Sequence, residues 1–305
     1  MPSPHFRVAA FAALALTALL APRAPLAAQS AQTDTTITVR ADARLDVDNF
    51  GGAVTVKTWD RAAVRVVGRH SRRDRVRLRD GGEVVRVSVS GSMGPSGVVE
   101  LDITVPATMA INLRGTYTDM SIEGTRAAIT ASTVQGDVIV KGGRDLVRLK
   151  SVEGRVSLEG ARGRVELNAV NKGISVVDVV GDVTAETING GITLERMDSG
   201  NVDAGTVNGG VTYDGTVKDG GIYSFRTHDG GITVSLPDRP NVTVTVASMQ
   251  GRISSDFPYE LPPGSSARRR QTFQLGAGSA RLEMESFSGT LRLRKRSATA
   301  PTRDE

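Results

Sequence analysis

The fold of this 305-residue chain is decided by one short phrase that recurs along it: VQGDVIV at 134–140, VEGRVSL at 152–158, INGGITL at 188–194, VNGGVTY at 207–213 and HDGGITV at 228–234. We call the first residue of the phrase position zero. Position zero falls in turn at Thr116, Val134, Val152, Val170, Ile188, Val207, His228 and Met249. These positions are evenly spaced at first and slightly wider apart towards the C-terminus. Self-similarity at a period of roughly 20 residues indicates a repeat architecture.

Apolar and polar residues alternate on both sides of position zero. The residues five and three positions before it are mostly apolar, the residue one before it is small, and those four and six after it are apolar. One repeat shows the pattern with Val147, Leu149, Ser151, Val156 and Leu158. Alternation with period two is typical of a strand with one buried face. Each repeat therefore predicts two short strands, with these residues pointing inward.

A polar residue directly follows position zero and precedes a Gly in most repeats, which predicts a tight corner between the two strands because Gly adopts positive φ at little cost. Asn171 departs from this rule, since Lys172 follows it. Stacked amides at such a corner would hydrogen-bond along the repeat axis, so we assign these residues a structural role. The predicted corner ladder is Gln135, Glu153, Asn171, Asn189, Asn208, Asp229 and Gln250.

Two architectures accommodate these paired strands. In the first, each strand pairs with its counterpart in the next repeat and the stack buries a continuous core. In the second, each Asn-Gly is a two-residue antiparallel hairpin. We favour the first, an all-β, β-helix-like parallel β-solenoid with coils of about 18–21 residues and two short strands per coil. Three further alternating segments, at 64–67, 84–89 and 98–105, predict an irregular β layer near the N-terminal end.

The ends of the chain differ from the repeats. Residues 1–28 resemble a signal peptide, with His5 and Arg7 before an apolar run at 8–21 that is too short to span a bilayer. Cleavage is expected after Ala28 or Ser30, and a membrane anchor is the alternative. The predicted organisation is then a flexible leader at 29–36, an N-terminal β segment and entry coil at 37–115, regular repeats at 116–256, a Pro/Arg-rich loop at 257–272, a C-terminal capping coil at 273–296 and a disordered tail at 297–305. Phe50 and Phe287 occupy position zero in the entry and capping coils.

Composition excludes several classes of protein. The formal net charge is +5, and removal of Arg7 and Arg23 with the leader lowers it by two. The remaining positive charge is too small to indicate a nucleic-acid-binding protein. Absence of Cys excludes disulfides, thiolate metal sites and a lipid-modified cysteine. Since no later segment is apolar enough to cross a bilayer, we expect no transmembrane span in the mature chain. The predicted location is the periplasm, the cell surface or the medium.

One outward position carries a hydroxyl in almost every repeat. It lies five residues after position zero and is flanked by Gly173, Gly191, Gly210 and Gly231, so the predicted surface is flat and sparsely decorated. Such a surface could bind a glycan, pack against a protein or contact ice, although Ser and Thr also suit exposed strands with no such role. The candidate binding face is Ser157, Ser175, Thr193, Thr212, Thr233 and Ser254.

No arrangement of reactive residues indicates catalysis. The mature chain has two His residues, His70 in an Arg-rich turn and His228 at position zero, where we expect a half-buried structural role. The outward acids Asp137, Glu166, Glu186 and Asp203 do not fall at one register, as the carboxylate pair of a β-helix glycosidase would. DGG triplets at 80, 219 and 229 lack the rest of a calcium-binding nonapeptide. We therefore expect no catalytic residue, no cofactor and no metal.

The phrases VQGDVIV, VEGRVSL and INGGITL, with NFGGAVTVKTWD at 49–60 and ELDITVPATMAINLRG at 100–115, resemble the bacterial β-strand-repeat family known as putative adhesins, a domain of unknown function. The resemblance covers about residues 40–295 and implies an exported parallel β-solenoid without catalytic residues. The main hypothesis is a non-enzymatic exported scaffold or adhesin that binds an unidentified glycan or protein of the envelope. The alternatives are an envelope stress or signalling accessory that contacts a membrane-bound regulator and, less favoured, a carbohydrate-active β-helix enzyme.

Overall fold

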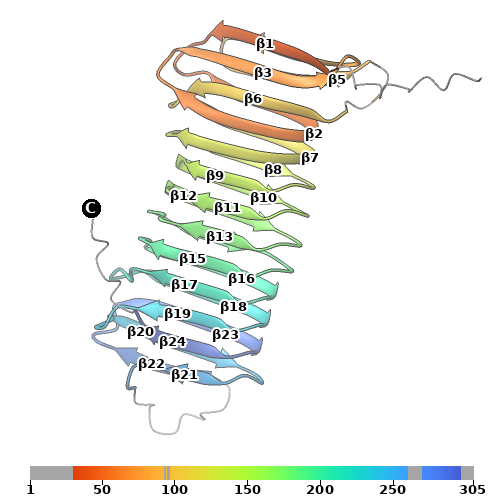
Figure 1. Ribbon diagram of the computed structural model, residues 1–305. Coiled ribbons are helices and arrows are strands. Elements are labelled where there is room, and N and C mark those ends of the chain that lie inside the picture. The colour runs from red at the N-terminus through yellow and green to blue at the C-terminus, as the bar shows by residue number, and fades with distance from the viewer. Residues whose placement is uncertain (1–29, 93, 95–96, 260–269, 297–305) are drawn as a thin grey trace, which may run out of the picture.

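The protein is an elongated stack of short strands, with the N-terminal segments at one end and the C-terminal coils at the other (Figure 1). The computed structural model describes residues 30–92, 94, 97–259 and 270–296. These residues form 24 strands and no helix, joined in one open sheet whose pairings are mostly parallel. The predicted all-β, solenoid-like fold is confirmed.

The central coils form two walls that meet at position zero. In the first wall the strands precede position zero, and the last two run one residue past it: β8 (Ile129–Thr133), β10 (Arg144–Ser151), β12 (Arg162–Ala169), β14 (Val183–Glu186), β16 (Asn201–Asn208) and β18 (Ile222–Asp229). In the second wall, strands follow it: β9 (Val138–Gly142), β11 (Val156–Glu159), β13 (Ile174–Val177), β15 (Ile192–Met197), β17 (Val211–Gly215) and β19 (Ile232–Leu236).

Each central strand pairs in parallel with its counterpart one repeat away. Leu149 of β10 lies beside Leu167 of β12, which lies beside Ala185 of β14. All three side chains are buried and belong to one continuous core. Because burying each aliphatic side chain contributes about 1.5–3 kcal/mol, a coil is stable only with neighbours that cover both of its sides.

Two long strands run through both walls near the N-terminal end. These are β2 (Arg44–Trp59) and β7 (Ala110–Thr125), paired with each other in parallel. The layer outside β2 consists of β1 (Ser30–Thr38), β3 (Ala63–Ser71), β4 (Asp74–Asp80), β5 (Val84–Gly91) and β6 (Val99–Pro106). Strands β5 and β6 continue the parallel stack beyond β2. In contrast, β4 is antiparallel to β5, β3 to β6 and β1 to β3.

The leader prediction for 29–36 is wrong over the part that the structure describes. Residues 30–38 form β1, and every residue of it is paired with β3. Val64 and Val66 of β3 are buried, and Ile37 packs against the same core. The isolated Ile in a run of polar residues gave too little alternation to reveal this strand in the sequence.

Order along the chain and order in space differ at the C-terminal end. This end contains β20 (Val242–Ser248), β21 (Ile253–Ser255), β22 (Arg270–Leu275), β23 (Ala280–Ser288) and β24 (Leu291–Lys295). The coil β23–β24 lies between β18–β19 and β20–β21, and β22 is antiparallel to β20. The prediction that 273–296 caps the stack is therefore wrong, since β23–β24 is an inner coil. With β22 on one side and β23 on the other, both edges of β20 are paired.

Several predicted segments fall wholly or mostly on residues that the structure does not describe. They are the signal peptide at 1–28, most of the loop at 257–272 and the tail at 297–305. Of that loop, Phe257 is buried and β22 begins at Arg270.

The predicted positive φ is found at the corner glycines Gly136, Gly209 and Gly230, whereas close stacking on the neighbouring coil applies to all of the predicted corner glycines. Gly154 is outside the positive-φ group, but a Cβ there would lie 1.7 Å from the carbonyl oxygen of Gly136 in the preceding coil. Gly190 would place a Cβ 2.5 Å from the backbone of Lys172. The chain thus requires Gly where one coil rests on the backbone of the next.

Candidate functional site

The corner ladder is a chain of side-chain hydrogen bonds through its middle. The Asn171 amide donates to the Glu153 carboxylate at 2.6 Å, Asn189 donates to Asn171 at 3.0 Å, and Asn208 donates to Asn189 at 2.8 Å. Each of these contacts joins consecutive coils across one parallel pairing. The middle of the ladder therefore ties four coils together on the outside of the stack.

The two ends of the predicted ladder are arranged differently. Within the described residues, the Gln135 side chain takes part in no hydrogen bond. Asp229 accepts the hydroxyl of Ser288 from β23, because that coil lies next to β18. Gln250 lies beyond it, and its contact with Phe287 is a hydrogen bond from the Gln250 backbone N–H. The ladder is thus Glu153 to Asn208, followed by Asp229–Ser288.

A second set of hydroxyls, inside the corner, supports the same stacking. The small residue before position zero is buried and donates to a carbonyl oxygen of the preceding corner: Ser151 to Gly136, Thr187 to Lys172 and Thr206 to Gly190, each at 2.8 Å. The sequence showed these positions as small residues, but only the structure shows what their hydroxyls bind.

The hydroxyl face is assembled from five of its six predicted residues. Ser157, Ser175, Thr193, Thr212 and Thr233 are consecutive partners across β11, β13, β15, β17 and β19. We call these five residues the hydroxyl row. At about 4.8 Å per strand the row is about 19 Å long. Within the described part of the chain none of the five hydroxyls has a hydrogen-bond partner, so all are available to solvent or a ligand.

Ser254 is separated from the hydroxyl row. Arg292 of β24 pairs with Thr233 on one side and with Ser254 on the other, because β24 lies between β19 and β21. At the opposite end the exposed side chain of Ile139 pairs with Ser157. A basic residue and an apolar residue therefore bound the row.

Two outward acids of the first wall, Glu166 and Asp203, face arginines. Glu166 contacts Arg148 at 2.8 Å and Arg164 at 3.0 Å, and these guanidinium groups hold the pKa of the Glu166 carboxyl below its usual range. Asp203 accepts from Arg226 at 2.8 Å. Glu166 and Asp203 thus lie in ion pairs rather than in a carboxylate pair.

His228 is exposed, which corrects the expected half-buried position. Its ring stacks on Phe287 with centroids 4.8 Å apart and planes at 14°. The sequence could not show this contact, because the two residues become neighbours only through insertion of β23–β24. His70 instead hydrogen-bonds Thr33 of β1 at 2.9 Å.

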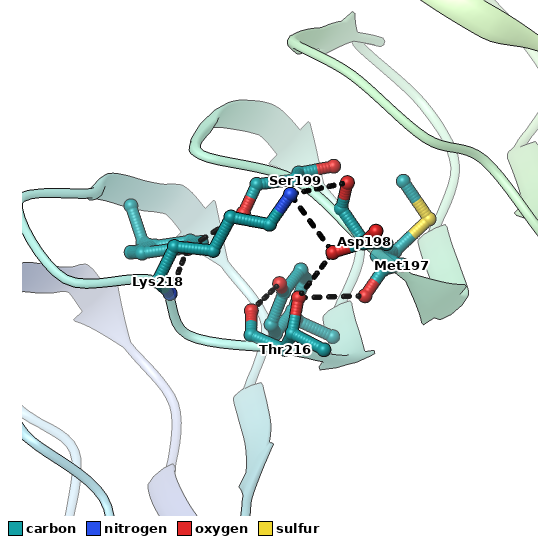
Figure 2. Close-up of polar contacts among 7 residues, drawn as sticks. Met197, Asp198, Ser199, Thr216 and Lys218 are labelled. Atoms are coloured by element: carbon teal, nitrogen blue, oxygen red, sulfur yellow. Dashed lines mark hydrogen bonds and ion pairs between the residues drawn. The ribbon is translucent and has the colours of Figure 1, made fainter.

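The coils near β17 and β18 are longer in sequence than the preceding ones. A cluster of polar residues lies at their corner opposite position zero. The Lys218 ammonium lies 2.9 Å from Asp198, and the Thr216 hydroxyl donates to Asp198 at 3.1 Å, as Figure 2 shows. These two contacts lower the pKa of the Asp198 carboxyl. The buried Tyr213 and Tyr223 rings lie behind the cluster, and burial raises the pKa of both phenols. The Tyr213 hydroxyl donates to the carbonyl oxygen of Thr216 and the Tyr223 hydroxyl to that of Ser199, each at 2.7 Å, so both rings connect the core to this corner.

Neither a metal site nor a membrane span is found among the described residues. No group of three or more His, Cys, Asp or Glu is placed to hold a metal ion in the described ranges. Over the same ranges, no helix is long and apolar enough to cross a membrane.

Comparison with known proteins places this geometry in a family. Residues 29–294 match the family model described as Toastrack DUF4097. The chain belongs to the Toastrack family. This confirms the resemblance to β-strand-repeat proteins of unknown function.

Solved structures similar to this Toastrack chain come from several bacteria. A putative adhesin from Bacteroides fragilis has 12% identity and a TM-score of 0.43, with 86% of this chain and 97% of the other covered. One from Parabacteroides distasonis has 9% identity and a TM-score of 0.42, covering 87% and 98%. A putative cell adhesion protein from Clostridium sporogenes has 10% identity and a TM-score of 0.27, covering 88% and 100%. No curated protein matches the sequence at a significant level.

Proposed function

We propose that this Toastrack chain is a non-enzymatic, exported scaffold that binds a glycan or protein of the bacterial envelope through its hydroxyl row. The observation that carries the proposal is the row itself, with five unpartnered hydroxyls in parallel register on one outer surface of the described chain. Hydrogen-bonding groups repeated along a rigid support bind at a low entropic cost, because the surface needs no ordering.

The shape of the surface supports contact with a large ligand. Gly173, Gly191 and Gly210 form the row beside the hydroxyls, and a Cβ at each would approach the carbonyl oxygen of the next coil, at 2.8 Å, 3.3 Å and 3.2 Å. The same glycines leave the hydroxyls without tall neighbours on that side. A flat polymer or protein surface can therefore reach several coils at once.

Binding is tested with the double substitution Thr193→Lys plus Thr212→Lys, which places two long charged side chains in the middle of the row. We expect loss of binding to glycan arrays and to envelope extracts with an unchanged melting temperature. Thr130→Lys plus Thr184→Lys is the matched control, since it adds the same charges to the outer surface of the first wall. Equal binding by the two double variants would exclude the hydroxyl row, and a recovered envelope protein instead of a glycan would identify the partner class.

Export is supported by the leader pattern at 1–28 and by the position of β1. Cleavage after Ala28 leaves β1 complete, and cleavage after Ser30 removes its first residue only. Cell fractionation with N-terminal sequencing tests this directly. We expect the chain outside the cytoplasm and beginning near residue 29 or 31, whereas an uncleaved chain retained inside cells would contradict export.

A further inference from the structure

The corner at position zero carries an apolar ridge on the outside of the molecule. Ten large apolar side chains are exposed in the described residues, and six of them occupy position zero: Phe50, Val134, Ile188, Val207, Phe287 and Met249, at 40–53% exposure. Tyr117 packs on Phe50 with ring centroids 5.5 Å apart, and His228 stacks on Phe287. We call these eight residues the ridge. Concentration of exposed apolar groups on one line marks an interaction surface.

The period of the ridge restricts what can cover it. Position zero repeats at about 4.8 Å along the stack, so the ten coils from Phe50 to Met249 span about 43 Å. An α-helix along the ridge presents one side chain per turn of about 5.4 Å, which is longer than the spacing of the coils. After about four coils the helix side chains are therefore displaced by half of the coil spacing. A strand along the ridge repeats at about 6.7 Å on one face and fits worse. A second stack of parallel strands keeps register over the whole length, and a second copy of this chain is such a stack.

The two flanks of the ridge differ in shape. One flank is the corner ladder, which follows position zero and whose residues are mostly exposed. The other is a row of first-wall residues two positions before it: Lys150, Asn168, Glu186, Gly205 and Arg226. A hollow of about 420 Å³ lies along this second flank, and Gly205 contributes no side chain to it. A Cβ at Gly205 would meet nothing within 4 Å. One flank therefore carries the ladder side chains and the other carries the hollow.

Two of the coils also carry opposite charges on their two flanks, and in one of these Arg226 additionally pairs with Asp203 of its own chain. Lys150 and Glu153 share one coil, and Arg226 and Asp229 share another. Lys150 has no ion-pair partner within the described residues. Consider two copies related by a twofold axis parallel to the long axis of the stack. The ladder of each copy then faces the hollow of the other. Glu153 of one copy lies opposite Lys150 of the other, and Asp229 opposite Arg226, so each charge pair occurs twice in the dimer. An antiparallel arrangement centred on Ile188 would instead set Glu153 against Asp229 and Lys150 against Arg226.

We propose that two copies of this chain associate side by side along their ridges, parallel and in register, with the ladder of each copy seated in the hollow of the other. The strip from two residues before to two after position zero is about 17 Å wide and 43 Å long, or roughly 700 Å². A standard interface buries roughly 800 Å² per partner. The hydroxyl row lies outside this strip, so a dimer would present it twice and increase avidity for a repetitive ligand.

Sedimentation and light scattering of the purified chain test the dimer. We expect a dimer that becomes monomeric in the variant Ile188→Asp plus Val207→Asp, with an unchanged circular dichroism spectrum because both positions are exposed. Ile139→Asp is the matched control, since Ile139 is 42% exposed but lies on the second wall away from the ridge. A chain that is monomeric at all concentrations, or a dimer insensitive to the ridge variant, would overturn the proposal.

Charge exchange tests the parallel register. Lys150→Glu alone and Glu153→Lys alone each bring like charges together twice, and we expect each to weaken the dimer about tenfold. Mixing the two variants restores both pairs between chains, so heterodimers should form with the original affinity. No recovery on mixing would contradict the parallel, in-register arrangement. The hydroxyl-row variant Thr193→Lys plus Thr212→Lys should remain dimeric, which separates this proposal from the proposed ligand site.

Discussion

The central coils and the C-terminal end of this solenoid are built from the same repeat but stacked by different rules. From β8 to β17, each coil pairs with the next one along the chain. At the C-terminal end, β18 pairs with β23 rather than with the next coil in sequence, and β20 lies beyond β23. The repeat pattern therefore predicts that each coil stacks on another coil. At the C-terminal end, contacts between segments far apart in the chain decide which coil that neighbour is.

The N-terminal end follows the same principle. There β2 lies between the later strands β5–β6 and β7, and the outermost strands are antiparallel. Non-local pairing closes both ends of the stack, whereas local pairing builds its middle. Since loop closure must precede non-local contacts, we expect the middle to form first during folding.

The largest expected effect comes from a charge in the middle of the core. Leu167→Asp buries a carboxylate with no partner at a fully buried site and should lower the free energy of unfolding by roughly 4–5 kcal/mol. Thermal and denaturant unfolding measure this. Asn168→Asp, on the outward side of the same strand, is the control and should change stability by less than about 0.5 kcal/mol. Similar losses for both variants would contradict the assignment of the inward face.

A core substitution at the C-terminal end should act locally. Phe273 of β22 is buried and its ring stacks on Tyr259 at 4.2 Å. Phe273→Ala should cost about 3 kcal/mol of local stability, with lost hydrogen-exchange protection in β20–β22 and unchanged protection in β8–β17. Thr272→Ala, exposed on the same strand, is the control. Uniform loss of protection along the whole stack would show that the end and the middle unfold as one unit.

The corner ladder should contribute less. Asn189→Ala removes two side-chain hydrogen bonds, to Asn171 and from Asn208, and should cost about 1 kcal/mol because both lie at the surface. Gln135→Ala changes the same corner position in a coil where the described residues form no such bond. Its free energy of unfolding should lie within about 0.5 kcal/mol of that of the parent chain. Chemical unfolding of the two variants gives the comparison, and equal costs would remove the ladder as a source of stability.

The smallest expected effect is a pH dependence at the opposite corner. The Arg196 guanidinium lies 2.6 Å from Asp178, and this hydrogen bond lowers the pKa of the Asp178 carboxyl from its ordinary 3.8. A lowered pKa contributes stability above the unfolded value, and the contribution is lost as pH falls through the folded value, below about pH 4. Both groups are largely exposed, so the effect is small. Asp178→Asn should flatten the acid end of the stability profile slightly, and an unchanged profile would show that the pair contributes nothing.

The sequence predicts the middle of the molecule well because each contact there repeats a local pattern. Val147 and Leu149 point inward for the same reason as Val165 and Leu167, so one alternating phrase specifies the wall. The hydroxyl row followed from that register, except at Ser254. No pattern around Ser254 could show that Arg292 lies between it and Thr233, because that contact joins segments far apart in the chain.

By itself, the sequence determined the all-β class, the two strands per coil and the corner glycines. Each of these depends on residue type and period alone. Tertiary structure decided the order of the terminal coils, the strand at Ser30–Thr38 and the apolar ridge. An apolar residue at a corner has the same period whether it points inward or outward, so only the path of the backbone around that corner places Ile188 and Val207 at the surface.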